Sequence, residues 1–192
     1  IKTFYDTVHH KNAKSSGKPS HHIRQLAKQL QFAPCQRVLD VACGTGEFLM
    51  ACAERGNSVA GVDLSDTAID QCKTRLPHGE FYACPAEKLP FDDDRFDLVT
   101  CLGSLEHFLD PVSALREMVR VAQPAAQFVI LVPNKDFLTR KLGLYGGTYQ
   151  VDAMEIVRTL DEWNVLFEAA GLTVSKRWKD LQDSSGYDVS RS

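Results

Sequence analysis

Two glycines interrupt the apolar stretch VLDVACGTGEFL, which runs from Val38 to Leu49. Gly44 and Gly46 lie between a run typical of a buried strand and a segment with the apolar periodicity of a helix. Because glycine has no side chain, a turn of this kind lets the backbone approach a ligand closely. Strand, glycine turn and helix in this order predict a site for a nucleotide.

A carboxylate ends the next apolar run, at Asp63. At the end of a second strand it can accept hydrogen bonds from both hydroxyls of an adenosine ribose, which suits NAD and S-adenosylmethionine equally. A dinucleotide-binding turn would read G-x-G-x-x-G, and Leu49 stands at the third glycine position. The turn is therefore weak evidence for NAD, and it fits close approach to a ligand carboxylate or ribose.

The elements that must position these residues alternate along the chain. Strands are predicted at 37–42, 58–64, 80–84, 96–102, 127–132 and 172–178, and helices at 22–31, 47–56, 66–76, from Asp110 through Ala122, and from Thr159 to Gly171. Alternation of this kind predicts an α/β fold, a Rossmann-like three-layer sandwich with a mostly parallel sheet of about six to seven strands and helices on both faces.

Length and composition favour one core, since the chain has 192 residues with 44% hydrophobic content. We expect residues 1–34 to form a polar leader and a helix that covers the site, and 35–192 to form the binding domain. An insertion at about 135–158 and the leader are long and lack regular pattern, as binding loops often do. Tyr5 in the leader, and Tyr145 and Tyr149 in the insertion, are candidates for contacts to cofactor and substrate.

Charge and cysteine spacing argue against several classes of protein. The net charge of −3 gives no support for nucleic-acid binding, and no apolar run reaches the roughly 18 residues that span a bilayer. Six cysteines without a C-x-x-C pair predict buried thiols in a reducing compartment and no metal site. We therefore expect a cytoplasmic protein; the chain begins with Ile1, so a preceding segment stays open.

As a set, VLDVACGTGEFL, GVDLS, CPAEKLPFDDDRFDLVTCLGSLEHFLDP, ALREMVRVAQP and VPN resemble the class I S-adenosylmethionine-dependent methyltransferases of the small-molecule type, the ubiquinone and menaquinone methyltransferases. The resemblance runs from about residue 36 to 178. It implies a seven-stranded sheet with S-adenosylmethionine across the carboxyl ends of strands one to four, where open parallel sheets bind ligands.

The resemblance also implies roles for individual residues. Asp40 would brace the glycine loop and the methionine amino group, Asp63 would hold the ribose, and Leu64 would line the adenine. The remaining positions that it marks for the cofactor are Ala42, Cys43, Gly44, Gly46, Ala86, Glu87, the carbonyl of Leu102, and Tyr5.

The chain departs from the family pattern at three places. Pro85 stands where relatives commonly have an acidic residue, which predicts looser adenine recognition because proline offers neither acceptor side chain nor N–H. Ala125 and Ala126 replace a glycine pair, which affects a turn. Only about 20 residues follow the last helix, so we expect a short or missing final antiparallel hairpin and a doubtful seventh strand.

The implied reaction is displacement at the sulfonium methyl, which needs an aligned nucleophile and a dry site more than a catalytic residue. For a hydroxyl acceptor a general base helps, and His107 after the fourth strand is the candidate. Packing over the cofactor is the alternative role for His107. The acceptor atom (O, N or C), the acceptor itself and the oligomeric state stay open.

Three alternative functions fit the same residues less well. A nucleic-acid methyltransferase would commonly carry Asn or Asp, then Pro-Pro and an aromatic residue, after strand four, where this chain has Leu102-Gly103-Ser104-Leu105. An NAD-dependent oxidoreductase is disfavoured by Leu49. A non-catalytic module that binds S-adenosylmethionine is the remaining alternative, motivated by Pro85 and the short C-terminus.

Overall fold

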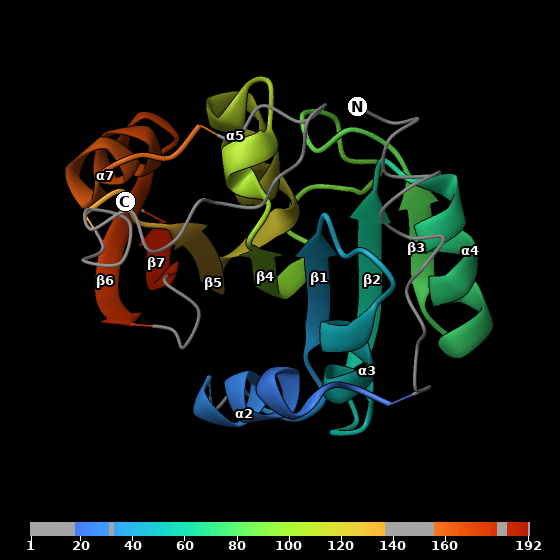
Figure 1. Cartoon of the computed structure of the whole chain (residues 1–192). Helices are drawn as coiled ribbons and strands as arrows, with labels where there is room; N and C mark the ends of the chain where they lie inside the picture. Colours follow the sequence, from blue (N-terminus) through green and yellow to red (C-terminus); the bar gives the residue numbers. More distant parts are fainter. Residues whose placement is uncertain (1–17, 31–32, 137–155, 180–183, 192) are drawn as a thin grey trace.

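A computed structural model describes residues 18–30, 33–136, 156–179 and 184–191 and shows one sheet of seven strands in the order β3-β2-β1-β4-β5-β7-β6 (Figure 1). The strands are β1 (Arg37–Val41), β2 (Ser58–Asp63), β3 (Glu80–Ala83), β4 (Phe96–Leu102), β5 (Ala122–Pro133), β6 (Leu172–Lys179) and β7 (Ser184–Arg191). The pairs among β1 to β5 are parallel, and β7 runs antiparallel to both β5 and β6. The predicted Rossmann-like fold class is confirmed.

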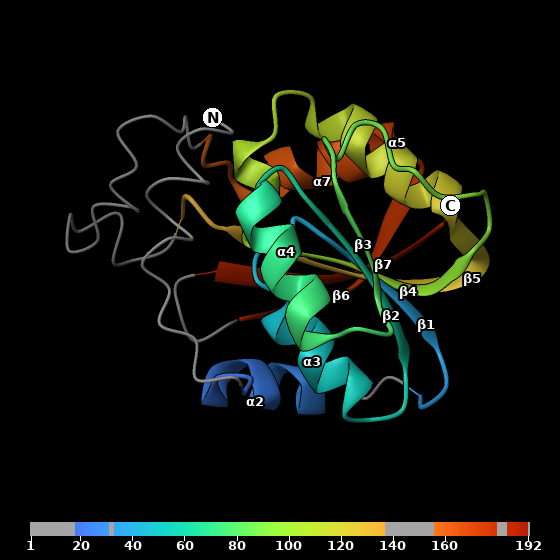
Figure 2. The ribbon, with the colours of Figure 1, turned by 90° about the vertical axis from the view of Figure 1, so that its right-hand side faces the viewer.

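Helices cover both faces of this sheet (Figure 2). One face carries α2 (His21–Gln29), α3 (Glu47–Ala53) and α4 (Asp66–Arg75), and the other carries α5 (Pro111–Val121) and α7 (Leu160–Ala169). A short 3-10 helix, η2 (Leu105–His107), follows β4.

The apolar core is divided between these faces by the alternation of side chains along the strands. Val38 packs in the cluster under α3, whereas its neighbour Leu39 packs in the cluster that includes Leu115 of α5 and Trp163 of α7. Both faces of the central strands are therefore buried, which explains their nearly continuous apolar sequence. Each large apolar side chain that is fully buried stabilises the fold by about 1.5–3 kcal/mol, so these two layers fix the sheet that carries the site.

The helix starts follow the predicted capping signals. Asp110 is the N-cap of α5 and accepts a hydrogen bond from Ser113 N at 3.0 Å, with Pro111 at the first helical position. Thr159 and Glu162 form the predicted capping box at the start of α7. Each cap satisfies backbone N–H groups that the helix itself cannot pair.

Two expectations about the second half of the chain were wrong. Ala122, expected on the helical face of α5, begins β5 and pairs with Phe96. Pro124 disfavours helical backbone at Gln123, and the helix ends just before this point, at Val121. The seventh strand, which was doubted, is present. β7 completes an antiparallel hairpin with β6 and fills the open edge of β5, where it buries Tyr187 and Val189.

Candidate functional site

Two adjoining cavities form one groove beyond the carboxyl ends of β1, β2 and β4. The first, the polar cavity, has a volume of about 300 Å³, and the second, the apolar cavity, has a volume of about 190 Å³. They share four lining residues, Ala42, Asp63, Ser104 and His107. The groove lies where the chain order of the sheet reverses, between β1 and β4, which is the point where open α/β sheets bind ligands.

The glycine loop between β1 and α3 forms one wall of the first cavity. Its backbone takes the left-handed conformation at Ala42, Gly44 and Gly46, with φ of 62°, 51° and 79°. Glycine adopts this region without strain, whereas at Ala42 the side chain makes the same backbone conformation unfavourable. Cys43 N donates to Val62 O at 2.9 Å, which ties the loop to β2. The loop is thereby held as a tight turn whose backbone faces the groove.

Asp63 fixes this loop from the end of β2. Its Oδ2 accepts a hydrogen bond from Gly44 N and its Oδ1 one from Ser65 N, both at 2.9 Å. The side chain is buried with 9% exposure and lines both cavities. For the N–H of Gly44, Asp63 therefore supplies the brace that the family resemblance had assigned to Asp40.

Asp40, the penultimate residue of β1, lines the first cavity. Its Oδ1 accepts a hydrogen bond from Thr100 Oγ1 at 2.6 Å, because β4 pairs with β1 in a register that places Thr100 beside it. Burial raises the pKa of the Asp40 carboxyl to about 7, the Thr100 hydrogen bond opposes this rise, and the negative charge of Asp63 adds to it. A buried carboxylate that is costly to ionise suits a cationic ligand group, which would supply the missing positive charge.

The second cavity has an apolar lining. Leu64 follows β2, Ala86 follows β3, and Phe108 and Leu109 follow η2. Burial raises the pKa of the Cys84 thiol, which also lines it, to about 11, so this sulfur stays protonated and uncharged at neutral pH. Apolar lining of this kind fits the ring of a nucleobase.

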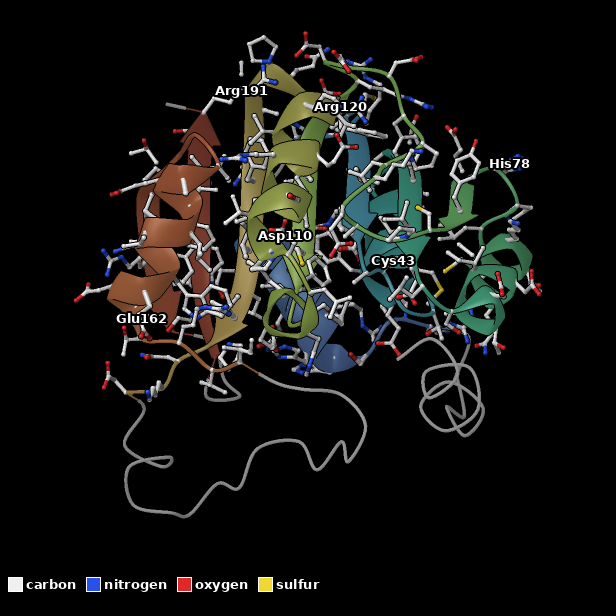
Figure 3. The ribbon with its side chains drawn as sticks, turned by 90° about the horizontal axis from the view of Figure 1, so that it is seen from above. Cys43, His78, Asp110, Arg120, Glu162 and Arg191 are labelled. Carbon is white, nitrogen blue, oxygen red and sulfur yellow. The ribbon has the colours of Figure 1, made fainter. Side chains whose placement is uncertain are left out.

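Arg120 of α5 anchors the segment between β3 and β4, whose first residues, Cys84 to Glu87, line the second cavity. Its guanidinium donates to Phe91 O at 2.8 Å and to Leu89 O at 3.0 Å, and it pairs with Glu117 and Asp93. Figure 3 labels Arg120 on α5. The short stretch after β3 is thereby fixed although it has no helix of its own.

His107 lies at the junction of the two cavities. It belongs to η2, its side chain is 14% exposed, and its Nε2 is 3.9 Å from Oε1 of the buried Glu106. Glu106 in turn offers its backbone carbonyl to Ile156 N at 3.0 Å. The imidazole therefore borders both the polar and the apolar end of the groove.

Most of the predicted site residues meet in this groove. Those that line it are Asp40, Ala42, Cys43, Gly44, Asp63, Leu64, Ala86, Glu87, Leu102 and His107. Gly46 is the N-cap of α3, directly after the lining residues of the loop. Tyr5, Tyr145 and Tyr149 lie outside the described residues.

Further lining residues were not predicted. They are Ile23, Thr45, Glu47, Phe48, Val62, Cys84, Gly103, Ser104, Phe108 and Leu109. Thr100, behind Asp40, was also missed. Its signal was a hydroxyl in the middle of the apolar run from Phe96 to Leu102, since a buried polar group usually has a partner.

Outside the groove, neither a metal centre nor a membrane-spanning helix is found among the described residues. Within the described ranges, no three His, Cys, Asp or Glu side chains gather into a group that could hold a metal ion. Among the same residues, no helix has the length and apolar character to cross a membrane.

The fold and this groove define a Rossmann-like nucleoside-binding protein, and comparison with known proteins narrows the class. The family described as "Methyltransferase domain" matches residues 39–130. A ubiquinone biosynthesis O-methyltransferase from Hahella chejuensis is 30% identical over 193 residues, which cover 94% of this chain and 79% of that protein. A demethylmenaquinone methyltransferase from Renibacterium salmoninarum is 37% identical over 116 residues, 60% of this chain and 49% of that protein.

A solved structure has the same fold. The 1,6-didemethyltoxoflavin-N1-methyltransferase of Burkholderia thailandensis, solved with 1,6-didemethyltoxoflavin and S-adenosylhomocysteine bound, superposes with a TM-score of 0.71 at 20% identity over 88% of this chain and 78% of that one. The chain belongs to the class I S-adenosylmethionine-dependent methyltransferases. It is an enzyme of the small-molecule type of this family, and its cofactor is S-adenosylmethionine, so the resemblance seen in the sequence is confirmed.

Proposed function

We propose that the groove holds S-adenosylmethionine with its methionine end in the polar cavity and its adenine in the apolar one. The cationic ammonium group would lie near Asp40, the ribose hydroxyls near Asp63, and the adenine between Leu64 and Ala86. The residues of the groove fit this cofactor. The one hydrogen bond described above for the buried Asp40 carboxylate comes from the neutral hydroxyl of Thr100, so the carboxylate can pair with the ammonium group. Glu87 at the edge of the apolar cavity would flank the adenine.

When bound, the sulfonium group supplies an activated methyl whose transfer removes a positive charge. The chain's own residues orient the reactants: the glycine loop and Asp63 fix one end of the groove, and the apolar cavity fixes the other. Alignment of this kind is worth several orders of magnitude in rate. The site therefore acts chiefly by positioning and by exclusion of water.

We propose further that the acceptor is a hydroxyl group of a small aromatic molecule, with His107 as its general base. The observation that carries this proposal is the position of His107 at the junction of the two cavities, beside the expected path to the sulfur. The relative of which the chain covers the larger share is named as an O-methyltransferase, which supports oxygen as the acceptor atom. Neutral imidazole has a pKa suited to accept a proton near neutral pH.

The leader is proposed to cover the polar end of the groove. Ile23 of α2 lines the polar cavity, and the N-cap residue of α2, Ser20, donates its N–H to Glu47 Oε2 at 3.4 Å. These contacts support a role for residues 1–34 as a cover. The insertion at 135–158, most of which lies outside the described residues, is proposed as the acceptor-binding segment.

Ligand-dependent thermal unfolding tests whether the protein binds this cofactor. S-adenosylhomocysteine and S-adenosylmethionine at about 100 times their dissociation constants should each stabilise the protein by roughly 2.7 kcal/mol, a shift of several degrees. NAD at the same concentration should give no shift. A shift with NAD alone would contradict the proposal.

Methyl transfer to a panel of catechols, phenols, amines and carbon acids tests the acceptor and His107. Transfer should be restricted to hydroxyl acceptors, and His107→Gln should lower kcat about 100-fold, the usual value of general base catalysis, with an unchanged dissociation constant for S-adenosylhomocysteine. His78→Gln, at an exposed turn residue far from the groove, is the control. Full activity of His107→Gln would assign His107 to packing alone.

A further inference from the structure

We propose that Cys72 and Arg75 of α4 are positioning residues for cofactor binding, which they support by holding the carbonyl groups of the glycine loop from outside the groove. The inference rests on the proposed cofactor site, since it assigns a support to that site. Neither side chain lines either cavity, whereas Gly44 and Thr45, whose carbonyls they contact, both line the polar one.

Cys72 makes the first contact. Its side chain is fully buried, and its Sγ donates to Gly44 O at 3.2 Å. The same sulfur lies 4.0 Å from Cys43 Sγ, and a Cβ built on Gly46 would come within 3.0 Å of it. The loop therefore packs directly on α4 at this point, and Figure 3 shows the labelled Cys43 on the side of the central strands that faces α4.

Arg75 makes the second contact, one helical turn further along the same face of α4. Its Nη1 donates to Thr45 O at 2.6 Å, and its Nη2 donates to the Gln71 Oε1 at 2.9 Å, which holds the guanidinium in place. A spacing of three residues puts both side chains on one side of a helix, facing two successive carbonyls. A hydrogen bond from a charged donor is stronger than one from a neutral donor.

Peptide geometry links these contacts to the groove. In a trans peptide the C=O and the following N–H point in opposite directions, and the described residues contain no cis peptide bond. Holding Gly44 O toward α4 therefore turns Thr45 N–H away from α4, toward the polar cavity that Thr45 lines. Asp63 fixes the neighbouring Gly44 N–H from β2. The loop is thus clamped on both sides, with α4 setting the direction of its carbonyls.

A clamp predicts an effect on binding that simple packing of α4 does not. The thiol and the guanidinium would set the loop conformation that the ligand meets, so their loss should weaken the cofactor complex more than the fold. If α4 only packs against the sheet, the variants should lower the melting temperature of the free protein and leave affinity, once folded, unchanged.

The test measures the dissociation constant of S-adenosylhomocysteine by calorimetry, beside the melting temperature of the ligand-free protein. Arg75→Met keeps the length of the side chain and removes its donors, and should raise the dissociation constant about tenfold. Arg75→Lys, which keeps a cationic donor, should recover part of this loss. Lys73→Met removes the same charge from an exposed position of α4 and should change affinity less than twofold.

Steady-state kinetics add a second readout. Arg75→Met should raise KM for S-adenosylmethionine by the same factor and change kcat less than twofold, because the group acts on binding through the loop. Cys72→Ala should raise the dissociation constant about threefold, and Cys72→Ser, which retains a donor, should stay close to the parent.

The outcomes separate the two proposals. If the parent protein fails to bind S-adenosylhomocysteine, the proposed cofactor site is wrong and the clamp falls with it. If the parent binds and Arg75→Met binds equally well, the cofactor site stands and the clamp is overturned. Loss of affinity that Arg75→Lys does not recover, with an equal loss in thermal stability, would also overturn it, in favour of a packing role.

Discussion

The polar and the apolar end of the groove are lined by different kinds of side chain. At the polar end, Asp40 and Asp63 are 3% and 9% exposed, and their oxygens already accept hydrogen bonds from the protein. At the apolar end, Leu64 is 36% exposed and Leu109 is 84% exposed, and most of the lining side chains are apolar. The polar end is fixed before a ligand arrives, whereas the apolar end exposes surface that a ligand would cover.

This difference assigns different tasks to the two ends. Directed hydrogen bonds and a buried carboxylate discriminate by geometry and charge, and an error in either is costly. Apolar surface contributes in proportion to the area that it loses to water, with little demand on direction. We therefore expect substitutions at the polar end to have larger and more specific effects than those at the apolar end. Methylthioadenosine, which lacks the amino acid group, separates the two contributions.

The largest effect is expected for Asp63→Ala. Asp63 lines both cavities and holds Gly44 N, so its loss should remove the proposed ribose acceptor and loosen the loop. Loss of charge-assisted hydrogen bonds of about 1.5–3 kcal/mol corresponds to a rise of roughly 10- to 150-fold in the dissociation constant of S-adenosylhomocysteine. Methylthioadenosine should weaken as much, because it carries the same ribose. Asp70→Ala, at an exposed position on α4, is the control; equal affinities of the Asp63 variant and the parent would contradict the placement of the ribose.

The next effect is a pH dependence that comes from Asp40, with a pKa of about 7 in the free protein. If the ligand ammonium pairs with the ionised carboxylate, affinity for S-adenosylhomocysteine should fall about tenfold between pH 8 and pH 6, because protonated Asp40 must first lose its proton. Asp40→Asn should bind weakly at both values without this dependence, and methylthioadenosine should show none in either protein. A flat profile for the parent would remove Asp40 from the ammonium site.

The free energy of unfolding of the ligand-free protein should change with pH in the opposite direction to the affinity, so it should fall as pH rises. The pKa of folded Asp40 lies above the ordinary value of 3.8, so the folded state holds the proton more tightly than the unfolded chain. The contribution of this group to stability is then fully present below about pH 4 and is lost as pH rises through about 7. Asp40→Asn should remove this part of the decline, as measured by denaturant unfolding across that range.

A smaller effect is expected at the apolar end from Leu64→Ala. Less apolar surface against the adenine should weaken S-adenosylhomocysteine and methylthioadenosine by the same factor, about fivefold for a loss of ~1 kcal/mol. Val165→Ala provides the control, since Val165 is 63% exposed on α7. A loss confined to S-adenosylhomocysteine would mean that Leu64 serves the amino acid end, and the orientation proposed for the cofactor would be reversed.

The smallest expected effect is a gain in affinity at the apolar end. Pro85 lines the apolar cavity at a place where relatives commonly carry an acidic side chain. Pro85→Asp adds an acceptor for the exocyclic amine of adenine and should tighten binding about threefold, the value of one modest hydrogen bond. Pro85→Ala, which adds no acceptor, should leave affinity unchanged, and a gain with Ala alone would point to relief of the proline ring.

Local patterns were enough to predict the framework that carries this site. β4 was placed at Phe96–Leu102 without error, and the capping signals at Asp110 and Thr159 marked the starts of α5 and α7. These features depend on side chains close in sequence, such as the three-residue reach of Thr159 to Glu162. The glycine spacing and Asp63 likewise pointed to a nucleoside before any contact was known.

Tertiary structure alone decided which groups meet across the sheet. Thr100 reaches Asp40 because β4 lies beside β1, Asp63 rather than Asp40 holds Gly44 N, and Arg75 holds Thr45 from thirty residues away. The seventh strand was also decided there, since the open edge of β5 supplies the hydrogen bonds that a short C-terminal segment needs to become β7. Sequence patterns record periodicity and propensity within an element, whereas hydrogen bonds between elements depend on strand order and register, which no single segment encodes.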